Sequence, residues 1–177
     1  MTRDQLEHAI RAASAIAGVE HLVIFGSQAI LGAYPDAHAL LRQSVEVDLC
    51  PLEEPHKVEA IEAVLGELSP FNATHGFYVH AIPIDEAVKL PTGWRNRLIP
   101  LGNENTERRT GWCLEPHDLA ASKLAAFREK DRDYVRVLIN EKFVRPDVLV
   151  DRLHTMPMST TAIERCVAWV TFTIADR

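Results

Sequence analysis

Two short stretches constrain the fold of this chain more than any others. Residues 21–26 (HLVIFG) form a continuous apolar run, which is typical of a buried strand. Residues 45–50 (VEVDLC) alternate between apolar and polar side chains, which is typical of a strand with one face on a core. A glycine-serine pair, Gly26 and Ser27, ends the first run and predicts a tight turn into a helix. Glu46 and Asp48 lie on one face of the second strand.

The rest of the chain predicts further elements around these two strands. We expect strands at 76–84 and 96–101, a loop at 35–43, and helices at 3–17, 27–34, 54–67, 116–140 and roughly 160–174. This order predicts an α+β fold, in which a small mixed sheet is flanked by helices and followed by a helical C-terminal part. We expect residues 1–113 to form the α/β core and residues 114–177 to pack on it within one compact domain.

The composition and the net charge argue against several classes of protein. The hydrophobic content of 47% suffices for a core, and three widely spaced cysteines fit neither a disulfide framework nor a zinc site. The N-terminus is charged and no apolar run is long enough to cross a bilayer, so we expect a cytoplasmic protein without membrane contact. The net charge of −6 argues against a general nucleic-acid coat.

The Gly-Ser turn has two interpretations. Backbone N–H groups between a strand end and a helix start lie at the positive end of the helix dipole, where glycine permits close approach of a phosphate. The Ser27 hydroxyl can bond a phosphate oxygen, or it can serve as an ordinary helix N-cap.

The two carboxylates, Glu46 and Asp48, also have two interpretations. Like charges this close repel each other, and burial makes them costlier, so a cation should meet them. Mg²⁺ or Mn²⁺ is the natural candidate, because hard cations take carboxylate oxygens and bridge them to phosphates. The alternative is an edge strand with a solvated polar face.

The predicted helix 116–140 carries a charge inside an apolar stripe. Asp131 falls in the middle of that stripe, and Lys123 and Arg128 border it. A carboxylate there is expensive unless it is paired, and Arg128 or Arg42 could pair with it. On one continuous helix, Lys123 and Asp131 would be roughly 12 Å apart and unable to pair, so a bound nucleotide between them is another option.

These stretches together resemble a known family. "FGSQAILG" followed by Arg42-x-Ser44-x-Glu46-x-Asp48 resembles the signature of the DNA polymerase β-like nucleotidyltransferase superfamily, in which a GS turn precedes an acidic-x-acidic strand. The spacing is similar to that of AbiEii-type toxins and their uncharacterised bacterial relatives. The resemblance continues in residues 90–98 (LPTGWRNRL) and 114–135, which contain Lys123 and Asp131.

The resemblance implies a nucleotidyltransferase-type sheet and an assignment of roles. Glu46 and Asp48 would hold the metal, Gly26, Ser27, Arg42 and Lys123 would bind the nucleotide, and Asp131 would help to arrange the catalytic groups. Mg²⁺ or Mn²⁺ would be the cofactor and an NTP the substrate. The acceptor would be RNA or tRNA, and a cognate antitoxin would be the partner.

The chain departs from the family pattern at two metal ligands. Glu46 stands where active enzymes usually have Asp, and His80 stands where relatives tend to carry a third Asp on the next strand. An imidazole is a poorer Mg²⁺ ligand but suits Mn²⁺, Zn²⁺ or Ni²⁺; Asp85 is a possible substitute, and a simply packed or surface histidine is the alternative. We predict that strand 76–84 lies beside strand 45–50, with His80 on the face of Glu46 and Asp48.

Two functions from different classes follow from these residues. The first is a metal-dependent nucleotidyltransferase that moves an NMP from an NTP to an acceptor hydroxyl. The second is a catalytically silent member of the same fold that binds a nucleotide or a partner protein, and the departures at Glu46 and His80 favour it.

Overall fold

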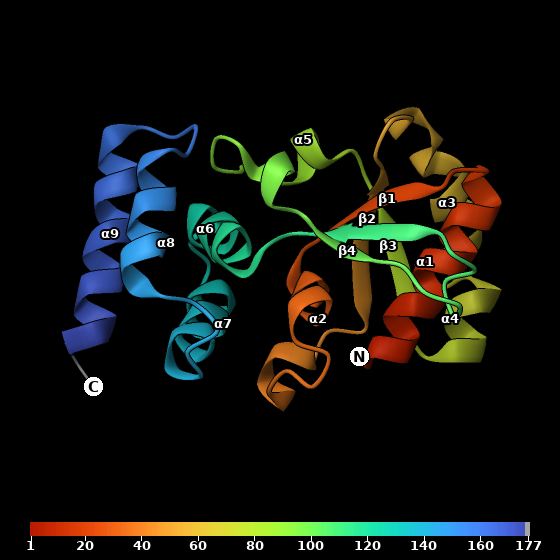
Figure 1. Cartoon of the computed structure of the whole chain (residues 1–177), viewed down its shortest axis with the longest axis horizontal. Coiled ribbons are helices and arrows are strands. Elements are labelled where there is room, and N and C mark those ends of the chain that lie inside the picture. The colour runs from red at the N-terminus through yellow and green to blue at the C-terminus, as the bar shows by residue number, and fades with distance from the viewer. Residues whose placement is uncertain (176–177) are drawn as a thin grey trace.

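The computed structural model describes residues 1–175 and contains a mixed five-stranded sheet with helices on both sides (Figure 1). The strands are β1 (His21–Phe25), β2 (Glu46–Pro51), β3 (Tyr78–Ala81), β4 (Ile99–Leu101) and β5 (Thr110–Cys113). Their order across the sheet is β3-β2-β1-β5-β4. β1 pairs antiparallel with β2 and parallel with β5, while β2 and β3 run parallel and β4 and β5 antiparallel. The predicted α+β class is confirmed.

The α-helices of the described residues lie on both sides of this sheet. They are α1 (Arg3–Ala17), α2 (Ile30–Ala33), α3 (Val58–Leu65), α4 (Pro70–His75), α5 (Ile84–Ala87), α6 (Pro116–Ala126), α7 (Glu129–Asn140), α8 (Pro146–His154) and α9 (Thr160–Ala175). Short 3₁₀ turns are η1 (Ser27–Ala29), η2 (Ala39–Arg42), η3 (Pro55–Lys57) and η4 (Trp94–Arg97). None of the helices in residues 1–175 is both long enough and apolar enough to cross a membrane.

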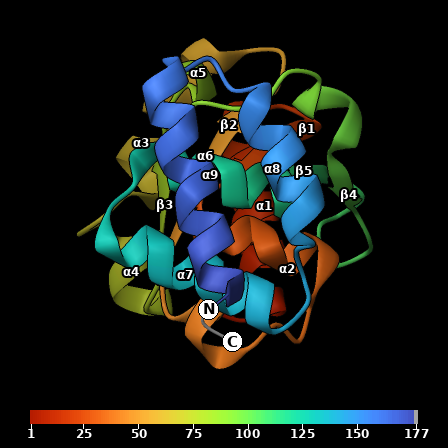
Figure 2. The same ribbon diagram turned by 90° about the vertical axis from the view of Figure 1, so that its left-hand side faces the viewer.

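The layers place α1, α3 and α4 on one face of the sheet and the helices from α6 onward on the other (Figure 1). In the view turned by 90°, α8 and α9 lie in front of α6, which therefore sits between them and the sheet (Figure 2). α6 also contacts η1 and α2, and α7 contacts η2. α6 and α7 thus contact η1, α2 and η2, the segments between β1 and β2.

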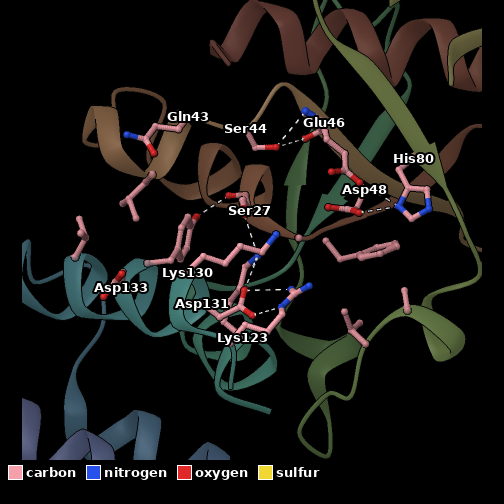
Figure 3. A pocket seen from close by; sticks show the side chains of 18 of the residues that line it. Ser27, Gln43, Ser44, Glu46, Asp48, His80, Lys123, Lys130, Asp131 and Asp133 are labelled. Carbon is pink, nitrogen blue, oxygen red and sulfur yellow. Dashed lines mark hydrogen bonds and ion pairs between the residues drawn. The ribbon is translucent and has the colours of Figure 1, made fainter. Parts of the chain in front are cut away.

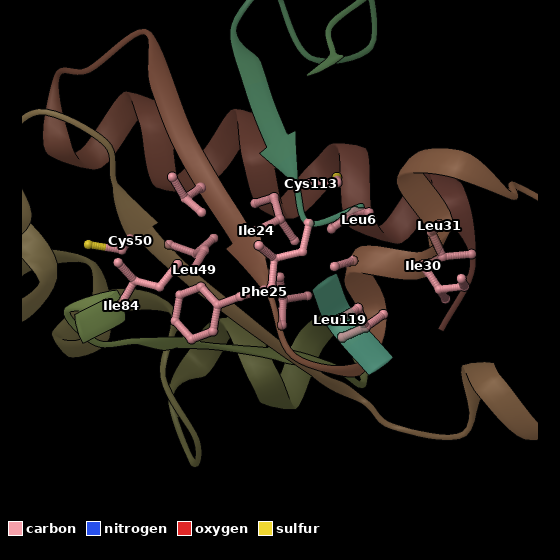
Figure 4. Close-up of a cluster of buried hydrophobic side chains, with 14 of the residues drawn as sticks. Leu6, Ile24, Phe25, Ile30, Leu31, Leu49, Cys50, Ile84, Cys113 and Leu119 are labelled. Atoms are coloured by element: carbon pink, nitrogen blue, oxygen red, sulfur yellow. The ribbon is translucent and has the colours of Figure 1, made fainter. Parts of the chain in front are cut away.

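Part of the hydrophobic core fills the space between α1 and the sheet, and the same core continues through α6 to α9 on the other face. Leu6 and Ile10 of α1 are fully buried, as are Ile24 and Leu49 of the central strands (Figure 4). A Cβ at Gly111 would lie 2.5 Å from the Ile10 Cδ1 atom, so this glycine allows α1 to approach β5 closely. α1 begins with a capping box at Thr2 and ends at Gly18 in the left-handed conformation, which confirms the predicted helix 3–17.

The predicted helix 116–140 is wrong as a single element. Phe127 takes a left-handed conformation (φ 55°) that ends α6, and Arg128 is extended and precedes α7. The break turns α7 back toward η2 instead of continuing the axis of α6. No glycine or proline marks this break in the sequence.

Other elements differ from prediction in extent or were not predicted. The predicted helix 27–34 is η1 followed by a single turn of α2, the loop 35–43 contains η2, and strand 76–84 shortens to β3. β4 lies within the predicted strand 96–101. α4, α5, β5 and α8 were not predicted. Val45, the first residue of the predicted strand 45–50, lies outside β2 and is exposed.

Candidate functional site

The turn after β1 brings the Gly26 backbone close to the Asp48 carboxylate. Gly26 has a φ of 66° and a ψ of −167°, which strains residues that carry a Cβ. A Cβ there would lie 1.9 Å from the Asp48 Oδ2 atom. Glycine is therefore required twice, for the conformation and for the carboxylate that lies over it.

Ser27 follows as the first residue of η1, and its hydroxyl does not cap the turn. Its Oγ instead accepts a hydrogen bond of 2.9 Å from Lys123 Nζ of α6. The Tyr134 hydroxyl of α7 donates to the Ser27 carbonyl at 2.6 Å. α6 and α7 are thus both hydrogen-bonded to the Gly-Ser turn.

Glu46, Asp48 and His80 form one cluster at the β2–β3 edge of the sheet (Figure 3). The parallel register pairs Asp48 with His80. His80 Nδ1 lies 3.2 Å from Glu46 Oε1 and 3.2 Å from Asp48 Oδ1. The predicted neighbourhood and orientation of His80 are confirmed. Val47, Leu49, Val79 and Ala81 point to the buried face, as the alternation predicts.

The surroundings of Glu46 in this cluster shift its pKa. Burial raises the pKa of Glu46, and the nearby Asp48 carboxylate raises it further, while His80 acts in the opposite direction. One ligand atom from each of the three residues lies within 4.8 Å of the others. Two carboxylates and an imidazole at this spacing fit a divalent cation, which would relieve the repulsion between the acids.

Lys123 and Asp131 pair directly, which corrects the expectation that they lie too far apart. The Lys123 Nζ atom is 3.6 Å from Asp131 Oδ1, because the break at Phe127 folds α7 back beside α6. Arg128 pairs with the same carboxylate, with its Nε 2.6 Å and its Nη2 3.3 Å from the two oxygens. Of the two partners considered for Asp131, Arg128 is therefore one and Arg42 is not.

The surroundings of Lys123 weaken its hold on a proton. Burial lowers the pKa of Lys123, although Asp131 and Asp48 act in the opposite direction. Only 14% of the side chain is exposed, and the Tyr134 ring centroid lies 5.3 Å from its ammonium. The ammonium therefore sits in a mostly dry environment between the Gly-Ser turn and α7.

One cavity of about 810 Å³ connects these groups. Its floor contains Gly26, Ser27, Glu46, Asp48 and His80, and its other side contains Lys123, Arg128 and Asp131. The volume falls within the range of ligand pockets. Candidate metal ligands lie at one end of the cavity and cations lie at the other. This arrangement suits a metal-bound polyphosphate.

Arg42 and Asp85 lie outside this cavity. Arg42 does not line it, and its Nε donates to the Ala37 carbonyl at 2.7 Å. The N-terminal amine of Met1 donates to the Arg42 carbonyl. Asp85 belongs to α5, beyond the end of β3, and does not line the cavity either.

The cavity also includes residues that the sequence reasoning did not assign. They are Leu40, Leu41, Gln43, Ser44, Ile82, Glu86, Ala87, Val88, Lys130, Asp133, Tyr134 and Val137, together with Phe25. Tyr134 and Lys130 could not be assigned because their orientation depends on the break between α6 and α7. Ser44 belongs to the motif that carries the resemblance, which is the one signal that could have singled it out.

A comparison with protein families finds one that covers nearly the whole chain. The family described as "Nucleotidyltransferase of unknown function (DUF6036)" matches residues 4–173. No curated protein and no solved structure matches the chain.

Proposed function

The chain belongs to this DUF6036 family of nucleotidyltransferases, and from that premise we propose that it transfers a nucleoside monophosphate from an NTP to an acceptor hydroxyl. The observation that carries the proposal is the convergence of two groups in one cavity. Glu46, Asp48 and His80 stand at one end, and Lys123 bonds Ser27 at the other.

Glu46, Asp48 and His80 would hold a divalent cation, Mg²⁺ or Mn²⁺. When bound, the cation would neutralise phosphate charge and favour departure of pyrophosphate. The β- and γ-phosphates would lie at the Gly26–Ser27 turn, where Lys123 would contact them. Asp131 would fix Lys123 in place through their 3.6 Å ion pair. Catalysis would consist of positioning the phosphate chain and stabilising its charge.

The resemblance to AbiEii-type toxins adds finer expectations that stay predictions. These are an RNA or tRNA acceptor and a cognate antitoxin. The cytoplasmic location, expected from the charged N-terminus and the cysteine pattern, also stays a prediction. The assignment of Arg42 to nucleotide binding also rests on the resemblance alone.

Labelling with radioactive NTPs tests the proposal. Purified protein with Mg²⁺ or Mn²⁺ should label total RNA or protein from at least one of the four NTPs, and Asp48→Asn should abolish labelling. Asp85→Asn is the matched control, because Asp85 is an exposed acid outside the cavity and its loss should leave labelling intact. If His80 is a ligand, Mn²⁺ should be preferred, and His80→Asp should shift the preference toward Mg²⁺. No labelling under any of these conditions would count against the proposal.

A second candidate is a catalytically silent member of the family that binds a nucleotide without turnover. It is favoured by the contact of His80 Nδ1 with both carboxylates at 3.2 Å, because these contacts engage the ligand atoms that a metal would need. Calorimetry with NTPs separates the two candidates. Binding without labelling supports the silent member, and binding with labelling supports the enzyme.

A further inference from the structure

The cations already assigned to the phosphates share one counterion. Lys123 and Arg128 both pair with Asp131, so these three side chains together carry a net charge of about +1. A triphosphate carries several negative charges, and the metal ligands Glu46 and Asp48 offset the charge of a divalent cation. The cavity therefore needs more positive charge than these groups supply.

Lys130 lies beside this cluster on α7 and also lines the cavity. In Figure 3 its side chain extends across the cavity beside Ser27 and the Lys123–Asp131 pair. Within residues 1–175, the Lys130 ammonium makes neither an ion pair nor a hydrogen bond. Its charge is therefore uncompensated and equals that of the neighbouring three side chains together.

None of the carboxylates that line the cavity in the described part of the chain pairs with Lys130, and several have other partners. Glu46 and Asp48 both contact His80. Asp133, which follows Lys130 by three residues, pairs with Arg136. The free ammonium thus faces a space that is lined by the proposed phosphate-binding groups.

We propose that Lys130 binds the terminal phosphates of the nucleotide and makes the cavity select a triphosphate over a monophosphate. This inference rests on the proposed function, which places those phosphates at Ser27 and Lys123. Lysine suits the task because its ammonium is a compact charge on a flexible stem that can follow a phosphate chain. The Lys130 side chain is exposed in the protein without a nucleotide, so replacing it should not disturb the fold.

Calorimetry with Lys130→Gln tests the inference, using inorganic tripolyphosphate, an NTP and the matching NMP as probes. Loss of one charge-assisted contact should weaken tripolyphosphate and NTP binding by about tenfold and leave NMP binding unchanged. Lys130→Glu should weaken the first two further. Arg132→Gln is the control, because it removes the same charge from the same helix, but its guanidinium lies 4.9 Å from the Phe127 ring and does not line the cavity.

The outcomes separate this inference from the proposed function. Equal tripolyphosphate affinity of wild type and Lys130→Gln overturns the inference and leaves the proposed function standing. Equal weakening by Lys130→Gln and Arg132→Gln also overturns it, since the effect would then come from the overall positive charge of α7 and not from a contact of Lys130. If the wild type binds neither tripolyphosphate nor any NTP, the proposed function fails and the inference fails with it.

Discussion

Asp118 and Asp131 are both buried carboxylates that are flanked by two cationic side chains, yet their surroundings differ. In the Asp118 cluster, Arg97 bonds both oxygens at 2.8 and 3.0 Å, and Arg152 lies 3.2 Å from one of them. In the Asp131 cluster, Arg128 bonds both oxygens and Lys123 lies 3.6 Å away.

The partners of Asp118 come from separate elements. Arg97 belongs to η4 and Arg152 to α8, while Asp118 itself is in the first turn of α6. Arg97 also donates to the Thr92 carbonyl. Burial raises the pKa of Asp118 even though both arginines oppose this effect. This cluster therefore joins three elements at the cost of desolvating a charge.

The partners of Asp131 face the cavity. Lys123 and Arg128 both line it, and 60% of the Arg128 side chain is exposed. Arg97, Asp118 and Arg152 do not line this cavity. We therefore interpret a buried carboxylate with two cations as a structural link when those cations do not line the cavity, and as a candidate binding group when they do.

The largest expected effect is the loss of stability in Asp118→Asn. The amide leaves two arginines without a counterion, and breaking a buried charge pair in this way costs about 3 kcal/mol. Chemical denaturation should show a lower midpoint with an unchanged slope, and labelling per folded molecule should persist. Asp151→Asn, on the exposed surface of α8, is the charge-matched control and should be neutral. A stable Asp118→Asn without activity would reverse the roles of the two clusters.

The next effect is the loss of activity in Asp131→Asn. Without its carboxylate, Lys123 loses the partner that fixes it, and we expect nucleotidyl transfer to fall roughly 10- to 100-fold. The free energy of unfolding should fall by only about 1 kcal/mol, because Arg128 can turn to water and Lys123 can release its proton.

Kinetics and denaturation of Asp131→Asn measure both quantities on one preparation. Glu129→Gln is the control on the same helix, since Glu129 is exposed and does not line the cavity. A variant that is as unstable as Asp118→Asn but retains its activity would show that the Asp131 cluster is structural as well.

Local patterns predicted the acidic end of the site well. The alternation of β2 places Glu46 and Asp48 on one face, and the same period in β3 places His80 beside them. These positions depend only on residues two apart and on which face is buried. The roles of the three residues stay predictions, because geometry alone does not show a bound ion.

The cationic end of the site could not be predicted, because it depends on contacts between distant residues. Phe127 adopts a left-handed conformation that bulky residues rarely take, and its sequence neighbours give no sign of it. Arg165 of α9 lies 4.2 Å from the Phe127 ring, so packing against the last helix helps to hold the break. β5 was missed for a similar reason, since a four-residue strand is defined by its pairing with β1.

The smallest expected effect is a loss of phosphate binding at alkaline pH. The cations of the Asp118 cluster are both guanidinium groups, which stay charged, whereas one cation of the Asp131 cluster is the ammonium of Lys123. Burial lowers the pKa of Lys123 from its ordinary 10.5, so its positive charge is present below the shifted pKa and is lost as pH rises through it. Tripolyphosphate affinity should therefore fall by about fivefold as the pH rises, and the midpoint of this fall should lie below pH 10.5.

Calorimetry across an alkaline pH series measures this effect, and thermal melting at each pH checks the fold. Lys130→Gln should retain the alkaline loss, because Lys123 is unchanged in that variant. Lys123→Arg should flatten the profile, because a guanidinium keeps its proton. If the profile of Lys123→Arg matches that of the wild type, another group controls the alkaline loss. The Asp131 cluster would then behave like the Asp118 cluster, with both of its cations charged throughout the series.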